Sequence, residues 1–135
     1  MLTIKTIVKN SDIEGLGLFA AEKISKGDTI WKFDARFDLY FSPAEVEKME
    51  SLQKDLIIHY AYLSPETGKY VYCADDARFF NHSATKSNVD IVPFPGEIET
   101  RAVAKRDIDI GEEILLNYRE IDIQDAVSSE EYLKL

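Results

Sequence analysis

The sequence predicts one α+β domain that is mostly β, built from many short strands and one clear helix. Three observations favour this class: apolar runs are short, turn signals recur about every ten residues, and only one stretch has helical periodicity. A chain of 135 residues is long enough for one ordinary hydrophobic core. We therefore expect residues 1–135 to form a single domain of small, irregular sheets.

The candidate strands are short runs rich in branched and aromatic residues. They lie between turns that contain Gly, Pro or Asp. The expected strands are 3–8, 29–33, 70–73, 89–93, 100–104 and 114–118, and the turns include 26–28, 65–68, 93–96 and 110–113.

A helix is predicted at about 43–58. Ser42 reads as an N-cap, Pro43 as the first helical residue, and Glu45 as the partner in a capping box. The apolar residues that follow at helical spacing are Val46, Met49, Leu52 and Leu56. We expect this stripe to pack in the core.

Composition excludes several classes of protein. Sixteen basic and 25 acidic residues give a net charge of −9, which argues against a general nucleic-acid binder and suits a basic partner. The charge is equally compatible with a role in solubility alone. One cysteine, Cys73, and two histidines exclude an internal disulfide and a cysteine-cluster zinc site. With no signal peptide or membrane span apparent, we expect a metal-free, intracellular protein, cytoplasmic or, in a eukaryote, nuclear.

Two short motifs are candidates for a site. Gly15-x-Gly17 would let the backbone approach a ligand, but it lacks the further glycine and the helix of a dinucleotide fingerprint. Asn81-His82-Ser83 follows Phe79-Phe80 and could be either a hydrogen-bonded turn or part of a site. Taken alone, each motif is better explained by a turn.

Three separated segments together resemble the SET domain, in that family's order. The segments are Gly15-Leu16-Gly17-Leu18-Phe19-Ala20 with Ile24-x-x-Gly27-Asp28-x-Ile30, then Arg78-Phe79-Phe80-Asn81-His82-Ser83, then Ala102-x-Ala104-x-Arg106-Asp107-Ile108-x-x-Gly111-Glu112-Glu113-Ile114-Leu115-Leu116-Asn117-Tyr118. The resemblance implies a β-clip of short sheets with a pseudoknot near the C-terminus. It also implies methylation of protein lysines with S-adenosylmethionine, leaving S-adenosylhomocysteine.

The resemblance also implies roles for particular residues. Tyr118 would be the catalytic tyrosine beside the transferred methyl group. The cofactor-binding residues would be Gly15, Leu16, Gly17, Phe80, Asn81, His82 and Tyr118. Asn81 would bind the methionine portion, and His82 would present its backbone to the adenine. No metal is implied, and residues 34–70 would be the variable insert that forms one wall of the substrate groove.

The sequence departs from the family at several positions. No cysteine-rich segment follows Tyr118, so we expect the tail 119–135 to close the lysine channel and cover the adenine with Tyr132 or an isoleucine. Residues 128–131 either cap a short final helix or belong to a loose end. Asn88 lies one residue later than the second asparagine of the family motif. Leu116 replaces an aromatic residue that limits methylation, so the number of methyl groups is not specified.

The leading interpretation is a lysine methyltransferase acting on a basic, histone-like or ribosomal protein, without direct nucleic-acid or membrane binding. Substrate choice would come from the groove or from contacts within a homo-oligomer. The alternatives are a catalytically weak SET-like module that binds a basic peptide, and a structural β-domain with chance motifs.

Overall fold

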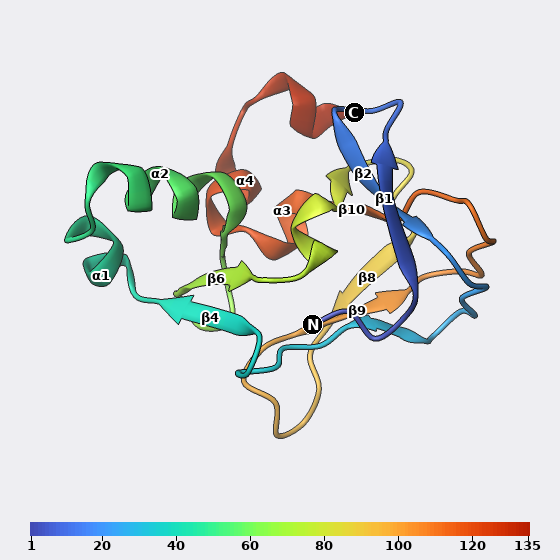
Figure 1. Cartoon of the computed structure of the whole chain (residues 1–135), viewed down its shortest axis with the longest axis horizontal. Coiled ribbons are helices and arrows are strands. Elements are labelled where there is room, and N and C mark those ends of the chain that lie inside the picture. Colours follow the sequence, from blue (N-terminus) through green and yellow to red (C-terminus); the bar gives the residue numbers. More distant parts are fainter.

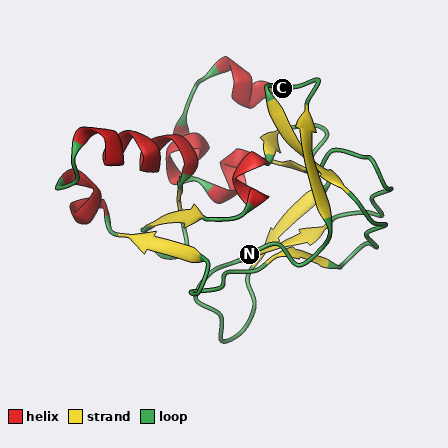
Figure 2. Ribbon diagram, in the orientation of Figure 1, coloured by secondary structure: helices red, strands yellow, loops and turns green.

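Short strands form four separate small sheets in the computed structural model, which describes residues 1–135 (Figures 1 and 2). The strands are β1 (Thr6–Asn10), β2 (Leu16–Ala20), β3 (Thr29–Trp31), β4 (Asp38–Phe41), β5 (Tyr62–Leu63), β6 (Tyr70–Cys73), β7 (Asn81–His82), β8 (Val89–Val92), β9 (Arg101–Ala104) and β10 (Leu115–Leu116). The helices are α1 (Pro43–Glu47), α2 (Ser51–Tyr60), α3 (Tyr118–Ile121) and α4 (Ile123–Val127), with 3-10 turns at Asp76–Phe79 and Glu131–Lys134. The predicted fold class, α+β and mostly β, is confirmed.

Three of the four sheets are antiparallel, and the fourth is a parallel pair. β1 and β2 form an antiparallel hairpin, β3-β9-β8 and β4-β6-β5 are antiparallel three-stranded sheets, and β7 pairs with β10 in parallel. In β9, Ala102 and Ala104 are buried while their neighbours are less so, as a period of two requires. The largest fully buried side chains of the core are Leu18, Ile24, Ile30, Ile108, Ile114, Leu133, Val71 and Val89. No helix in the chain is both long enough and apolar enough to cross a membrane.

The prediction of one helix at 43–58 is wrong, because the structure contains two helices there. α1 begins at the predicted capping box of Ser42 and Glu45, but it ends at Glu47, with Lys48 as its C-cap. A second capping box, between Glu50 and Gln53, then starts α2. The break changes the direction of the chain, so one apolar stripe cannot face one core.

The predicted core stripe is therefore only partly buried. Val46 is buried, whereas Leu52 is 85% exposed and Leu56 is 45% exposed. The residue of α2 that the core covers is Ile57 instead. In Figure 1, α1 and α2 lie with β4 and β6 on the left, apart from the β1–β2 hairpin on the right.

Two expectations for the C-terminal part also need correction. Tyr118 does not end a strand, because the Asn117 side chain accepts a hydrogen bond from Arg119 N and starts α3 at Tyr118. Ser128 does not cap a helix that contains Glu131. It is the residue after the end of α4, and its hydroxyl accepts a hydrogen bond from Glu130 N. The tail is not a loose end, because Leu133 is only 1% exposed.

Candidate active site

Asn81 joins the end of the β1–β2 hairpin to β7. Its side-chain NH₂ group donates to the carbonyl oxygens of Glu14, at 3.2 Å, and Leu16, at 3.1 Å. Gly15, between these two, has a φ of +48°, a region that glycine adopts without strain. The hydrogen bonds therefore bring the first glycine-containing motif and the Asn-His motif together across more than 60 residues of chain.

Position 17 has room only for glycine, because the Glu113 carboxylate lies close to its Cα. A Cβ at this position would lie 2.1 Å from Glu113 Oε1 and 3.0 Å from Asn81 Nδ2. Glu113 Oε1 accepts from Asn81 Nδ2 at 2.9 Å, and its Oε2 accepts from Ser11 Oγ at 2.9 Å. The absent side chain of Gly17 thus makes room for the contact between Asn81 and Glu113.

His82 uses both nitrogens of its buried ring. Nδ1 accepts from Tyr118 N at 2.9 Å, so Nε2 carries the proton and donates to Leu133 O at 3.1 Å. The ring also packs against Tyr118 and Tyr132, with centroid distances of 5.1 and 6.3 Å. The imidazole therefore fixes the start of α3 and the C-terminal tail, in addition to any role of its backbone.

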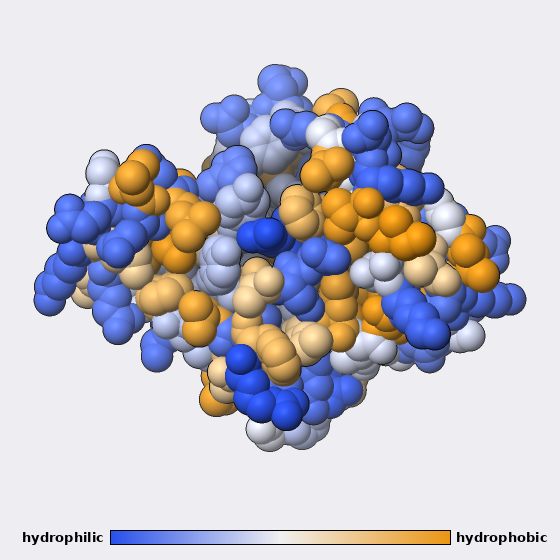
Figure 3. Space-filling model, viewed as in Figure 1, coloured by the Kyte–Doolittle hydropathy of each residue, from blue (hydrophilic) through white to orange (hydrophobic).

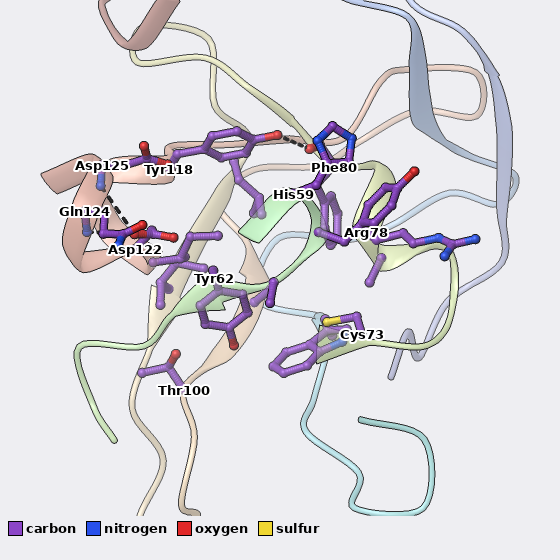
Figure 4. A pocket seen from close by; sticks show the side chains of 18 of the residues that line it. His59, Tyr62, Cys73, Arg78, Phe80, Thr100, Tyr118, Asp122, Gln124 and Asp125 are labelled. Carbon is purple, nitrogen blue, oxygen red and sulfur yellow. Dashed lines mark hydrogen bonds between the residues drawn. The ribbon is translucent and has the colours of Figure 1, made fainter. Parts of the chain in front are cut away.

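The Tyr118 hydroxyl points at the backbone of the segment that contains Phe80 and Asn81. The hydroxyl donates to the carbonyl oxygen of Phe80, one residue before Asn81 (Figure 4). Burial, and then the nearby charge of Asp125, raise the pKa of Tyr118 well above its ordinary value. Tyr118 is consequently a neutral phenol at physiological pH, able to orient a ligand but unable to act as a base.

A pocket of about 380 Å³ lies beside Tyr118. Its wall is mainly apolar and includes Phe80, Leu116 and Ile91, and Figure 4 shows Tyr62 and Cys73 toward the end away from Tyr118. The surface is hollowed between α2 and the β1–β2 hairpin, with hydrophilic residues at the centre (Figure 3). A mainly apolar pocket of this kind suits a long side chain with a small polar end.

Cys73 has no nucleophilic role at this wall. Burial raises the pKa of the Cys73 thiol far above its ordinary value, so the reactive thiolate is not formed at neutral pH. Tyr118 is therefore the better candidate for a chemical role.

The tail supplies one side of the pocket. Ile121, Asp122, Asp125 and Tyr132 are among its lining residues, so a tail isoleucine and Tyr132 both border the pocket. Asp122 also accepts a hydrogen bond from Leu63 N, at 3.1 Å, which joins the tail to β5 of the insert. The insert and the tail thus form facing walls that are linked by one hydrogen bond.

The structure brings the predicted site residues from three distant segments into one region. Sequence reasoning missed Glu113, Asp122 and Leu133 as parts of this region. Glu113 lies inside the third SET-like segment, which runs from Ala102 to Tyr118. The sequence of that segment does not distinguish Glu113 from Glu112; their contacts in the fold do. Asp122 and Leu133 belong to the tail, where the sequence carries no motif that assigns individual contacts.

Asn88, which the sequence left without a role, is structural. It is 1% exposed, and its side chain donates to Glu113 O and accepts from Leu115 N, each at 2.9 Å. Its amide therefore holds the segment that leads into β10 and Tyr118.

Comparisons with known proteins agree with this fold. The family model described as the SET domain matches residues 15–119. A candidate histone methyltransferase of Plasmodium falciparum superposes with a TM-score of 0.57 at 20% sequence identity, over 84% of this chain and 92% of that chain. A search of curated proteins gives no match.

Larger assemblies contain the same fold. A chain of a humanized Chaetomium thermophilum Polycomb Repressive Complex 2, bound to the inhibitor GSK126, has a TM-score of 0.62 at 25% identity, over 89% of this chain and 15% of that chain. A chain of an active Polycomb Repressive Complex 2 in the basal state has a TM-score of 0.61 at 28% identity, over 85% of this chain and 15% of that chain. This chain therefore spans only about 15% of the length of those polycomb chains. Because the family model covers most of the sequence and the neighbours have the same fold, the chain belongs to the SET domain family.

Proposed function

We propose that this chain transfers a methyl group from S-adenosylmethionine to the ε-amine of a lysine in a basic protein. The SET domain match and the histone methyltransferases among its neighbours support protein-lysine methyltransferase activity in general. The observation that carries the finer proposal is the position of the Tyr118 hydroxyl, next to the Phe80–His82 backbone and beside the apolar pocket. An intracellular location stays a prediction from the sequence.

The residues around Asn81 fit the methionine end of the cofactor. The carbonyl oxygens of Glu14 and Leu16, the Asn81 amide and the Glu113 carboxylate present mainly hydrogen-bond acceptors. An ammonium group has three donors and no acceptor, so this set complements it. His82 and Ser83 continue along the same segment, where the adenine would lie.

Lysine must be neutral to act as the nucleophile. With an ordinary pKa near 10.4, deprotonation at pH 7 costs roughly 4.6 kcal/mol. The apolar wall of Phe80, Leu116 and Ile91 removes water from the amine and favours its neutral form. Asp122 and Asp125 also line the pocket, and with the net charge of −9 they attract a basic substrate.

Bound S-adenosylmethionine would supply an electrophilic methyl group on a sulfonium. The neutral lysine amine would take up this methyl group as the C–S bond breaks, with the electron pair left on sulfur. The positive charge would move to the methylated nitrogen, which would then lose a proton to water. The neutral Tyr118 hydroxyl, already donating to Phe80 O, keeps its oxygen lone pairs for orienting the amine. Catalysis of this kind depends on positioning and on the electrostatic environment.

The test is transfer of labelled methyl groups to histone and ribosomal proteins, with the target lysines located by mass spectrometry. Tyr118→Phe should lower turnover by about 10²–10³-fold, because it removes one positioned hydroxyl from the reacting centre. Binding of S-adenosylhomocysteine, measured by calorimetry, should change little. Tyr70→Phe is the matched control, since Tyr70 lies in β6 outside the pocket lining.

The same experiments separate the alternatives. Unchanged turnover in Tyr118→Phe would remove Tyr118 from the mechanism. Retained binding of a basic peptide without any methyl transfer by the wild type would favour the binding module. No binding of S-adenosylhomocysteine by the wild type would contradict the proposed function itself.

A further inference from the structure

The Asn81 amide serves more acceptors than it has protons. Its two N–H groups face three oxygens: Glu14 O, Leu16 O and Glu113 Oε1, at 3.2, 3.1 and 2.9 Å. The Asn81 carbonyl oxygen accepts no hydrogen bond from the protein. The cluster is therefore short of donors, and a ligand that brings several N–H groups would complete it.

Glu113 adds a negative charge to this cluster without a cation of its own. It forms no ion pair with any Lys or Arg, whereas the adjacent Glu112 pairs with Arg106 at 2.9 Å. Its oxygens accept only from Asn81 Nδ2 and Ser11 Oγ. Holding a partly buried carboxylate without a counter-charge is unfavourable, and a bound cation would offset that cost.

We infer that the Glu113 carboxylate is the counter-charge for the α-ammonium of the cofactor's methionine portion and makes the site selective for ligands carrying that ammonium. This inference rests on the proposed function, because it assigns one residue within the same site. Gly17 is part of this binding site, because any Cβ at position 17 would displace the Glu113 carboxylate.

The electrostatics around Tyr118 point the same way. Besides burial and Asp125, the charges of Glu14 and Glu113 help to raise the pKa of Tyr118. The negative potential of this cluster thus reaches the hydroxyl beside which the sulfonium would lie.

The test combines one protein change with one ligand change. Glu113→Gln keeps an oxygen that accepts from Asn81 Nδ2 and turns an NH₂ group toward Ser11 Oγ, which can accept in its place, so the main loss is the charge. Glu112→Gln removes the neighbouring charge that Arg106 neutralises. Each protein is titrated in a calorimeter with S-adenosylhomocysteine and with its analogue lacking the α-amino group. Circular dichroism and thermal unfolding check that each variant is folded.

The wild type and Glu112→Gln should bind S-adenosylhomocysteine far more tightly than the deaminated analogue. Glu113→Gln should weaken S-adenosylhomocysteine binding by about 10–100-fold, the range for losing a charge-assisted contact, and change the analogue's affinity by no more than about twofold.

Three outcomes would overturn the inference. Equal losses for both ligands in Glu113→Gln would make Glu113 a structural support for Asn81 only. Equal affinity of the wild type for the two ligands would contradict the assigned charge even if the variant failed to fold. Failure of the wild type to bind either ligand would instead overturn the proposed function, and the inference with it.

Discussion

Replacing Asn88 by alanine should destabilise the protein through two backbone groups that the side chain now satisfies. Asn88 is 1% exposed, and its amide spans Glu113 O and Leu115 N, with 2.9 Å for each hydrogen bond. The backbone bond from Asn88 N to Leu115 O, at 3.1 Å, does not depend on the side chain and should persist. The variant therefore isolates the contribution of the side-chain amide.

The magnitude follows from the two orphaned groups. Each buried polar group left without a partner costs roughly 1–3 kcal/mol, and the Leu115 N–H is fully enclosed while Glu113 O is only partly so. We expect a loss of about 3–4 kcal/mol, a large share of the ~5–15 kcal/mol available to a domain. Asn88→Asp should cost at least as much, because it turns a second acceptor toward Glu113 O and buries a charge.

Urea unfolding followed by the fluorescence of Trp31 measures this loss, since Trp31 is buried and is the chain's one tryptophan. Asn10→Ala is the control. Asn10 is exposed at the end of β1, and its variant should stay within about 0.5 kcal/mol of the wild type. If Asn88→Ala is equally mild, the amide does not hold the segment before β10, and the reasoning fails.

Two further predictions concern the tail. Asp122→Asn should weaken the link to Leu63 N, and it should change the pH dependence of unfolding. Burial raises the pKa of Asp122, so the folded state binds its proton at higher pH than the unfolded state, and this group's contribution to stability falls as pH rises through that interval. Urea unfolding of both proteins from pH 4 to pH 7 should show this fall in the wild type only; parallel profiles would refute it. Leu133→Ala keeps the backbone oxygen that His82 contacts but removes a side chain that is 1% exposed, so it should loosen the tail, increase proteolysis within it and weaken binding of S-adenosylhomocysteine. Leu135→Ala, at a position 71% exposed, should have none of these effects; equal effects of the two variants would exclude a specific role for Leu133.

The fold class could be predicted because its signals are local. Short apolar runs between turns located β6, β8 and β9 to within a few residues, whereas β7, which contains Asn81 and His82, was not predicted as a strand. The division of the predicted helix could not be read in the same way. Glu50 and Gln53 form a capping box in the middle of an apolar pattern that continues across it, and a pattern of spacing does not detect a change in chain direction.

The site was predicted as a set of residues, while its contacts were not. The three motifs identified Gly17, Asn81 and Tyr118, but nothing in them indicated that Glu113 fills the space beside Gly17. Glu112 and Glu113 are chemically identical neighbours, and only the folded chain gives one of them Arg106 and the other Asn81. Local sequence cannot distinguish two residues whose difference is the partner that each one meets.

The site depends on the whole fold, because its residues meet partners that are far away in the sequence. Asn81 meets Leu16 across 65 residues, His82 meets Leu133 across 51, and Tyr118 meets Phe80 across 38. All of these contacts join distant parts of the chain, and the parallel pair β7–β10 holds Asn81 and His82 beside Leu115 and Leu116. A variant that loosens this pair, such as Asn88→Ala, should therefore reduce cofactor binding even under conditions in which most molecules remain folded. A variant whose main effect is to remove a charge, such as Glu113→Gln, should reduce binding without reducing stability. This contrast separates the residues that build the site from those that recognise its ligand.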